Sequence, residues 1–219
     1  MCMIVSVHCL VCLLALSVIG TSYNCCGMSV KQNVILAPLE ADDRENFILE
    51  NQEAFKFGAL QEFGPRDDHF EEDEEIISRG TIEQSIDEPT AETYRIVCDG
   101  EKVGGLVIRI DREQNKGHLE LLFVSPKSHS RGIGYAAWCQ VERIHPEIRI
   151  WETVTPYFEK RNIHFYVNRC GFHIVEFFNS HHPDPHDPDP APESSHEDSS
   201  HGLFRFEKEI GRASCRERV

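Results

Sequence analysis

Basic residues are scarce relative to acidic ones in this chain of 219 residues. Lys and Arg number 22 against 37 Asp and Glu, which gives a formal net charge of -15. Phosphate backbones and anionic membrane surfaces are bound largely through Lys and Arg. The charge balance therefore argues against nucleic acid and against an anionic membrane surface as partners.

The central part of the chain also lacks the cysteine spacing of a zinc site or a disulfide framework. Only Cys98, Cys139 and Cys170 lie between residue 27 and the C-terminal tail, and they are far apart in sequence. Disulfide-rich secreted domains and zinc modules carry closely spaced cysteines instead. We therefore expect a reduced, cytoplasmic protein without a metal site.

One long apolar run is present, from Met3 to Ile19, and no Lys or Arg precedes Lys31. A secretory signal normally begins with positive charge, and a membrane anchor needs about 20 apolar residues. We therefore favour Met28 as the natural start, although a secreted or membrane-anchored protein stays open if residues 1–27 are real. Residues 210–219 look like one reading frame of a sequencing adapter, so the predicted domain is 28–209.

The first part of this domain reads as one strand and two helices. Val34–Leu39 is short and apolar, and the stretch after it begins with acids, as a helix N-terminus prefers, and stops at Gly58. The acidic run Asp67–Glu75 then leads into isoleucines at helical spacing from Ile76 to Ile86. We expect the acidic run to be a solvated surface.

Two turn signals predict antiparallel strands in the middle of the chain. Asp99-Gly100 supplies the positive φ angles of a tight hairpin, and Asn115–Gly117 marks the next turn. The segment His118–Val124 alternates and then becomes continuously apolar, which is typical of a buried central strand.

Strands and helices alternate after this central strand. The His- and Pro-rich insertion 181–202 has no apolar periodicity, and we expect a flexible loop rather than a metal site there. The remaining predicted elements are helix Gly134–Ile144, strand Ile148–Val154, helix Lys160–Arg169 closed by Cys170-Gly171, strand Phe172–Phe178 and strand Leu203–Glu209.

The segment LELLFVSPKSHSRGIGYAAW carries the chemistry. A buried strand ends at Val124, a polar loop follows, and a Gly-x-Gly stands where a helix begins. Glycines let the backbone approach an anion closely, while unpaired N–H groups and the helix dipole favour negative charge there. The pattern predicts a pyrophosphate cradle. It is not a nucleotide P-loop, because no Lys-Ser/Thr follows the second glycine. It is not a dinucleotide fingerprint either, because Ala137 stands where the third glycine would be.

Strand, loop, RGIG and helix resemble motif A of the GNAT superfamily of N-acetyltransferases, and NIHFYVNRCGF from Asn162 to Phe172 resembles its motif B. The resemblance runs from about Val34 to Glu209. It implies an α/β (α+β) GNAT fold, with a central mixed sheet of about six to seven strands, about four flanking helices, and a splay between the fourth and fifth strands. It also implies acetyl-CoA as the acetyl donor and direct transfer to an amine.

The resemblance assigns a set of cofactor-binding residues. Backbone groups of Phe123 and Val124 would bind the pantetheine arm, and Asn162 would contact coenzyme A. His129 stands where the family usually has Gln or Arg; the backbone N–H groups of Ser130 to Gly134 would still bind the phosphate, and Arg131 could compensate for the side chain. The residues implied at the pyrophosphate are His129, Ser130, Arg131, Gly132, Ile133 and Gly134.

Catalytic roles fall to a tyrosine and a carboxylate. By resemblance, Tyr166 is the candidate general acid, although its spacing to Gly171 is one residue longer than usual in the family. Glu120, among apolar neighbours on the central strand, is the candidate general base, and Glu152 is a second candidate. Water relay of the proton is an alternative to both. We interpret Cys139 and Cys170 as core residues.

The leading hypothesis is an acetyl-CoA-dependent N-acetyltransferase that acts on a primary amine of a small molecule or peptide. The acidic balance favours a cationic acceptor, and a homodimer stays open. Two alternatives are a non-catalytic acyl-CoA-binding regulatory module, prompted by His129 and the displaced Tyr166, and a secreted acidic metal-binding protein. The second alternative leaves the order of the motifs unexplained.

Overall fold

A computed structural model describes residues 33–63, 76–128, 132–183 and 202–211. Its strands form one sheet of seven in the order β1-β2-β3-β4-β5-β7-β6. The strands are β1 (Val34–Pro38), β2 (Ala91–Cys98), β3 (Glu101–Asp111), β4 (Lys116–Val124), β5 (Ile150–Pro156), β6 (His173–Phe178) and β7 (Leu203–Glu209). The helices are α1 (Arg44–Phe63), α2 (Arg79–Asp87), α3 (Ile133–Ile144) and α4 (Lys160–His164), the last continuing as a π-helix from Phe165 to Cys170.

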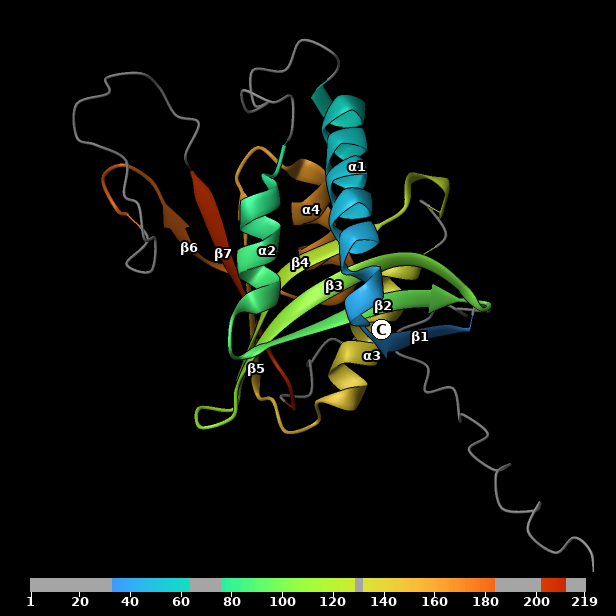
Figure 1. Ribbon diagram of the computed structural model, residues 1–219. Helices are drawn as coiled ribbons and strands as arrows, with labels where there is room; N and C mark the ends of the chain where they lie inside the picture. The colour runs from blue at the N-terminus through green and yellow to red at the C-terminus, as the bar shows by residue number, and fades with distance from the viewer. Residues whose placement is uncertain (1–32, 64–75, 129–131, 184–201, 212–219) are drawn as a thin grey trace, which may run out of the picture.

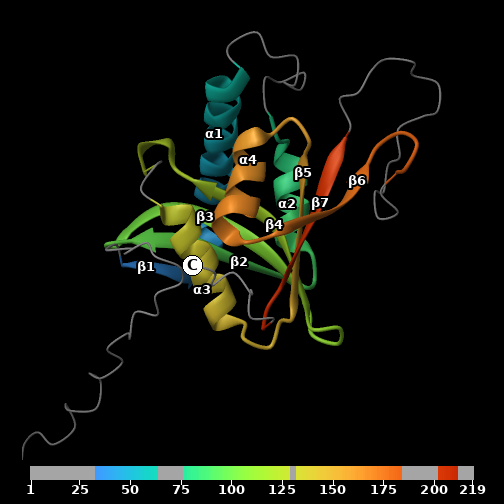
Figure 2. The ribbon, with the colours of Figure 1, turned by 180° about the vertical axis from the view of Figure 1, so that it is seen from behind.

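Helices cover both faces of the sheet. The face that carries α1 and α2 is turned to the viewer in Figure 1 and is called the front face. Figure 2 shows α3 and α4 over the opposite, back face. The predicted α/β fold, with a mixed sheet of about seven strands and four helices, is therefore confirmed.

The first four strands form an antiparallel meander, as their turn residues predict. Asp99 and Gly100 adopt φ angles of 52° and 90° in the β2–β3 turn, and Asn115 adopts 54° before β4. Both turn predictions are confirmed, because these residues tolerate the left-handed region best.

The parallel pair β4–β5 is short. Its register covers only Lys116 with Ile150, Gly117 with Trp151 and His118 with Glu152. From Leu119 onward β4 has no strand pairing with β5, whereas it stays paired with β3 up to Val124. We call the stretch without β4–β5 strand pairing, Leu119–Val124 of β4 and Thr153–Pro156 of β5, the splay. The predicted separation of the fourth and fifth strands is confirmed.

A β-bulge lies on β4 inside the splay. In the register with β3, Val107 pairs with Leu121 and Ile108 with Leu119, so Glu120 is the extra residue. A bulge of this kind changes which residues face which side of a strand. Leu119 accordingly packs in the back-face core, while Leu121 and Phe123 pack in the front-face core.

The prediction that the first helix stops at Gly58 is wrong, because α1 continues to Phe63. Glycine inside a helix costs about 1 kcal/mol, which tertiary contacts often outweigh. At Gly58 the Nη1 atom of Arg161 lies 3.8 Å from the position that a Cβ atom would take. The absent side chain leaves room for this arginine of α4. The predicted start of this helix after the acidic residues is confirmed, since α1 begins at Arg44. The acidic run 67–75 lies outside the described residues.

Aromatic side chains dominate the back-face core. Trp138 of α3 packs edge-on against Trp151 of β5 and tilts against Phe172, with ring centroids 5.2 Å apart in both pairs. A Cβ on Gly117 would lie 2.3 Å from the Trp151 ring, so only glycine allows β4 and this tryptophan to approach so closely. This packing fixes α3 against the start of the β4–β5 pair.

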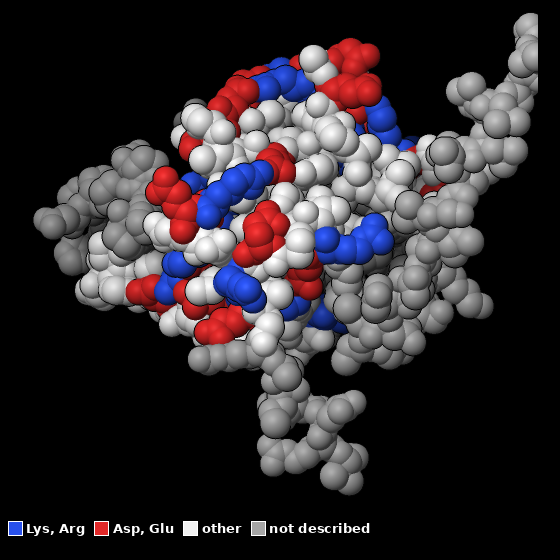
Figure 3. Space-filling model, turned by 90° about the horizontal axis from the view of Figure 1, so that it is seen from below, with Lys and Arg blue, Asp and Glu red and all other residues white. Residues whose placement is uncertain are grey.

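Charge is mixed on the face of the molecule that is seen from below. Figure 3, which views the molecule from below, shows Lys and Arg interspersed with Asp and Glu rather than separated from them. None of the helices in the described part of the chain is both long and apolar enough to cross a membrane.

A buried ion cluster ties α1 to the sheet. Arg95 of β2 is 1% exposed, and its guanidinium donates to Asp43 at 2.7 and 3.1 Å and to Glu50 at 2.7 Å. Lys102 donates to the same Asp43 carboxylate at 2.7 Å. The hydrogen bond from Arg95 is the main reason why the pKa of Asp43 falls to about 2, against the effect of burial.

Asp43→Asn should lower the free energy of unfolding near pH 7 by about 3 kcal/mol, because it leaves the buried Arg95 charge short of a partner. The folded-state pKa of Asp43 is depressed, so its contribution is present above the ordinary value near 4 and is lost as the pH falls toward about 2. Urea unfolding at pH 7 and at pH 2.5 measures both effects, and the difference between the proteins should shrink at the lower pH.

Asp87→Asn is the matched control, since Asp87 pairs with Arg44 at the surface, where its side chain is 62% exposed. It should change stability far less. Equal losses in the two variants would contradict the role given to the buried cluster.

Candidate active site

The glycine-rich turn stands at the start of α3. Gly132 is the N-cap of this helix with φ 76°, a left-handed conformation that side chains rarely adopt. A Cβ at Gly132 would meet no atom of the described residues within 4 Å. The first backbone N–H groups of α3, beginning with Ile133, have no partner within the helix and point along the positive end of its dipole. The turn can therefore receive an anion.

Three segments converge on the first turn of α3. A Cβ at Gly134 would lie 3.6 Å from the ring of Phe165 and 3.8 Å from Val124. The start of α3, the end of β4 and the π-helix after α4 therefore meet at Gly134. The predicted contacts of His129, Ser130 and Arg131 fall on residues outside the described part of the chain.

Phe123 and Val124 lie at the end of β4, where it borders the splay. On one side they pair with Gly105 and Gly104 of β3. A Cβ at Gly104 would lie 2.2 Å from the backbone oxygen of Phe123, so glycine is needed for this close pairing. On the other side the ladder to β5 has already ended. This edge of β4 therefore carries no ladder to β5, and it has the extended form that an added strand would follow.

Thr153 marks the point where the β4–β5 ladder stops. This fully buried residue of β5 donates its hydroxyl hydrogen bond to the backbone oxygen of Leu119 at 3.0 Å. The side chain thus replaces the next backbone bond of the ladder. A hydrogen bond also links Thr153 with the hydroxyl of Tyr166. The tyrosine hydroxyl therefore lies at the inner end of the splay.

Tyr166 is held by aromatic packing. Its ring centroid lies 5.5 Å from that of Phe206, 5.8 Å from Phe172 and 5.5 Å from Phe165. Burial raises the pKa of Tyr166 to about 12. The phenol therefore keeps its proton throughout the neutral and mildly alkaline range.

The extra residue between Tyr166 and Gly171 is absorbed by a π-helix, Phe165–Cys170. The backbone N–H groups of Gly171 and Phe172 both bond the carbonyl of Tyr166. A wide turn of this kind accommodates one added residue without ending the helix, and such turns are frequent at functional sites. The longer spacing therefore still leaves Tyr166 facing Thr153.

Asn162 lies one turn before Tyr166 and faces the same strand. Its Nδ2 atom donates to the hydroxyl oxygen of Thr155 at 3.4 Å. Thr153 and Thr155 are two residues apart on β5, so Asn162 and Tyr166 follow the same edge of the splay. The structure thus brings together Gly132, Gly134, Val124, Asn162 and Tyr166 on the back-face side.

Glu120 does not stand among apolar groups alone. Its carboxylate accepts a hydrogen bond from Nε of Arg109 and lies 3.7 Å from Nε2 of His118. The Glu120 side chain is 22% exposed. To take a proton from an amine, Glu120 would have to weaken its ion pair with Arg109.

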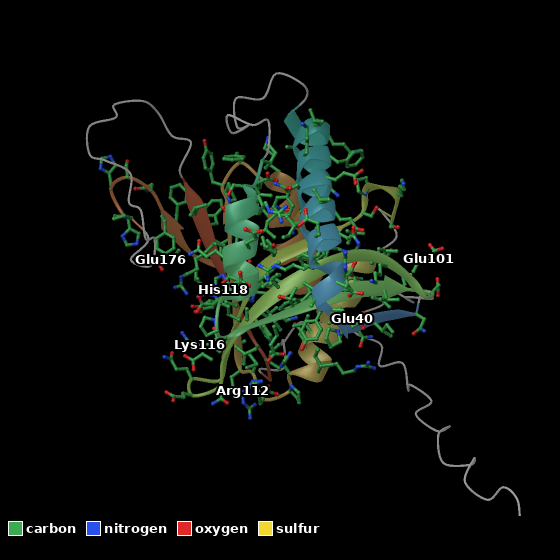
Figure 4. The ribbon with its side chains drawn as sticks, in the orientation of Figure 1. Glu40, Glu101, Arg112, Lys116, His118 and Glu176 are labelled. Atoms are coloured by element: carbon green, nitrogen blue, oxygen red, sulfur yellow. The ribbon has the colours of Figure 1, made fainter. Side chains whose placement is uncertain are left out.

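His118 is the residue that the sequence reasoning missed. It stands two residues before Glu120 on β4, a spacing that places side chains on one face of a regular strand. The two side chains lie 3.7 Å apart although Glu120 is the bulge residue. Figure 4 labels His118 above Lys116 of the same strand, and its imidazole lies on the same face of β4 as Glu120. Its imidazole therefore lies next to the candidate base, at the residue where the β4–β5 pairing ends.

Glu152, the second candidate base, belongs to a chain of ion pairs across the front face. Lys116 lies 3.4 Å from its carboxylate and Nη1 of Arg205 lies 3.2 Å from it. Arg205 also binds Glu176 at 3.0 Å and Glu207. Two cations hold Glu152, which makes it a structural link between strands rather than an available base.

The remaining candidates concern thiols and metals. Cys170 is buried, and burial raises the pKa of its thiol far above the usual range, so it is a poor nucleophile. Among the described residues, no group of three or more His, Cys, Asp or Glu side chains could hold a metal ion. Most of the His-rich insertion lies outside those residues.

The sequence and the fold both match known proteins. Residues 53–172 match the model of the acetyltransferase (GNAT) family. The chain is 48% identical over 153 residues to the uncharacterized protein YrkN of Bacillus subtilis (strain 168), which covers 70% of this chain and 80% of YrkN.

Three solved structures share the fold at low identity. The PaiA N-acetyltransferase of Thermoplasma acidophilum, in complex with coenzyme A, gives a TM-score of 0.54 at 18% identity, over 81% of this chain and 99% of the other. The ribosomal-protein-S18-alanine N-acetyltransferase of Escherichia coli gives 0.54 at 12%, over 85% and 100%. The spermidine N-acetyltransferase of Vibrio cholerae, in complex with CoA and spermine, gives 0.54 at 11%, over 80% and 95%. With its family match, its relative and its fold in agreement, the chain belongs to the GNAT family of acetyltransferases.

Proposed function

We propose that this protein is an acetyl-CoA-dependent N-acetyltransferase that transfers the acetyl group directly to a primary amine. The observation that carries the proposal is the splay, which opens where the β4–β5 ladder ends at His118 and reaches Val124, beside the first turn of α3 and its left-handed N-cap Gly132. An opened strand edge and an anion-binding helix start, joined by a short loop, suit a ligand with an extended arm and a pyrophosphate.

The residues present fit acetyl-CoA. The first turn of α3 offers backbone N–H groups and an open position at Gly132 for the pyrophosphate. Phe123 and Val124 offer backbone groups for the pantetheine arm, and Asn162 lines the same edge of the splay. Of the predicted pyrophosphate residues, Gly132, Ile133 and Gly134 form the N-cap and first turn of α3, and the pyrophosphate contacts of all six residues are part of this proposal.

Bound acetyl-CoA would supply an acetyl thioester and a thiol leaving group. Tyr166 is positioned to donate its proton to that sulfur, because its hydroxyl lies at the inner end of the splay and stays protonated at neutral pH. Thr153 orients the hydroxyl through its hydrogen bond. Backbone N–H groups beside the β4 bulge would stabilise charge on the carbonyl oxygen.

For the amine proton we propose His118 and Glu120 acting as a pair. Histidine ordinarily titrates nearest to neutral pH, so its imidazole suits a base better than a carboxylate that is held by arginine. Glu120 would orient the imidazole and stabilise its protonated form across the 3.7 Å that separates them. The acceptor itself we expect to be cationic, in line with the net charge of -15.

Gly132→Glu should weaken acetyl-CoA binding at least 10-fold in isothermal titration of the full chain, because it adds a side chain and a negative charge where the pyrophosphate would lie. Gly100→Glu is the matched control. Gly100 also has a positive φ and open space around its Cβ position, but it lies in the β2–β3 turn. Equal affinity in the two variants, or no binding by the folded wild type, would remove the basis for the proposed function.

Tyr166→Phe should lower kcat by about 100- to 1,000-fold without changing acetyl-CoA affinity, because it removes only the proton donor. Since the pKa of Tyr166 is raised to about 12, loss of its proton should not slow the wild type until the pH approaches that value. Stopped-flow rates between pH 6 and 10 test both points. Tyr157→Phe, at a residue 39% exposed, should behave as the wild type; a similar loss there would contradict the assignment.

His118→Gln should lower kcat/KM by about 100-fold or more near pH 7, because it removes the base. Glu120→Gln should have a smaller effect, since it removes only the group that orients the imidazole. The pH profile of kcat/KM distinguishes the roles: its acid limb should vanish in His118→Gln and shift in Glu120→Gln. If Glu120→Gln were the more damaging change, the carboxylate would be the base, as the sequence alone predicts.

A further inference from the structure

Asn51 of α1 is a fully buried polar residue without a hydrogen-bond partner. It is 0% exposed, and neither its amide oxygen nor its amide nitrogen has a partner among the described residues. Its neighbours on the inward stripe of α1 are apolar and buried: Phe47, Ile48 and Ala54. A buried amide with neither bond made is costly, because it has lost its water and gained nothing in return.

Asn51 lies on the part of α1 that follows the contact between α1 and the splayed end of β4. Phe47, one turn earlier, packs over Gly105 and against Phe123 at the end of β4, with ring centroids 5.1 Å apart. Gly58, about two turns later, lies beside Arg161 of α4. Figures 1 and 2 both show α1 and α4 next to each other at the same end of the sheet.

The stretch of α1 from Phe47 to Gly58 therefore runs from the splayed end of β4 toward α4. Eleven residues of helix cover about 16 Å, and Asn51 is the buried polar side chain within that stretch. It lies on the front-face side of the splay. The start of α3, Asn162 and Tyr166 lie on the back-face side.

The separation of these residues between the two faces of the sheet determines from which face the acceptor amine would enter the splay. If acetyl-CoA enters from the back-face side, as the proposed function holds, the acceptor must reach the thioester from the front-face side, beneath α1. We propose that Asn51 binds the acceptor, and that the acceptor carries a carbonyl next to its amine, as the N-terminus of a peptide or an amino-acid amide does. This inference rests on the proposed function.

The hydrogen-bonding needs of the Asn51 side-chain amide favour acceptors that carry a carbonyl next to the amine. Its oxygen needs a donor and its nitrogen needs an acceptor, and both are unmet. An α-amine with its adjacent carbonyl offers N–H groups and a carbonyl oxygen within reach of one side chain. A polyamine offers N–H donors only and would leave the Asn51 nitrogen unpaired. Such an unpaired group is the usual source of strong discrimination between substrates.

The test compares the full-length wild type with Asn51→Leu, which has a similar volume and no polar atoms. Alanyl-alanine amide and spermidine serve as acceptors, and mass spectrometry measures the acetylated products. The wild type should acetylate the dipeptide amide at least 10-fold faster in kcat/KM than spermidine. Asn51→Leu should lose at least 10-fold on the dipeptide amide, bind acetyl-CoA as the wild type does, and melt at a higher temperature, since the unpaired amide is gone.

Glu53→Leu is the control, because it places leucine on the exposed side of the same helix. It should leave both acceptor rates unchanged. The inference is overturned if Asn51→Leu keeps the dipeptide rate, if it melts lower than the wild type, or if spermidine is the better acceptor. Failure of every protein to bind acetyl-CoA would overturn the proposed function as well, whereas normal binding with any of those three results overturns only the role of Asn51.

Discussion

The early end of hydrogen bonding between β4 and β5 is the constraint on which the site depends. Three residue pairs join these parallel strands, and beyond them the hydroxyl of Thr153 donates a hydrogen bond to the backbone carbonyl of Leu119. The strands then diverge while β4 stays paired to β3. Because the same threonine binds Tyr166, the opening of the sheet and the orientation of the candidate acid have one cause.

The surrounding packing keeps that opening in place. Trp151 fills the space that Gly117 leaves, which holds β5 to the start of β4. The Arg95 cluster holds the beginning of α1 on β2, and from there α1 runs past the end of β4 toward α4. The ends of the splay are thus fixed by contacts that lie away from it.

Much of this could be predicted from the sequence, because the relevant physics is local. Asp99-Gly100 and Asn115 adopt the positive φ angles that their turns require, and the glycine at the start of α3 is left-handed. The splay between β4 and β5 was predicted from the resemblance to GNAT enzymes and not from local sequence patterns. The rest depends on contacts between distant residues: Arg109 meets Glu120, Arg161 approaches Gly58, and a bulge and a π-helix each absorb one residue. No periodicity reports these features, and the buried, unpaired Asn51 is visible only when α1 is packed on the sheet.

The central claim of the proposed function is that acetyl-CoA forms hydrogen bonds with the edge of β4 that has no ladder to β5. Amide hydrogen exchange of the full chain, with and without saturating coenzyme A, tests it most directly. The account predicts that coenzyme A slows exchange within Glu120–Val124 as well as at the start of α3, because both segments would gain hydrogen bonds. Unchanged exchange in that part of β4, with coenzyme A bound, would contradict it.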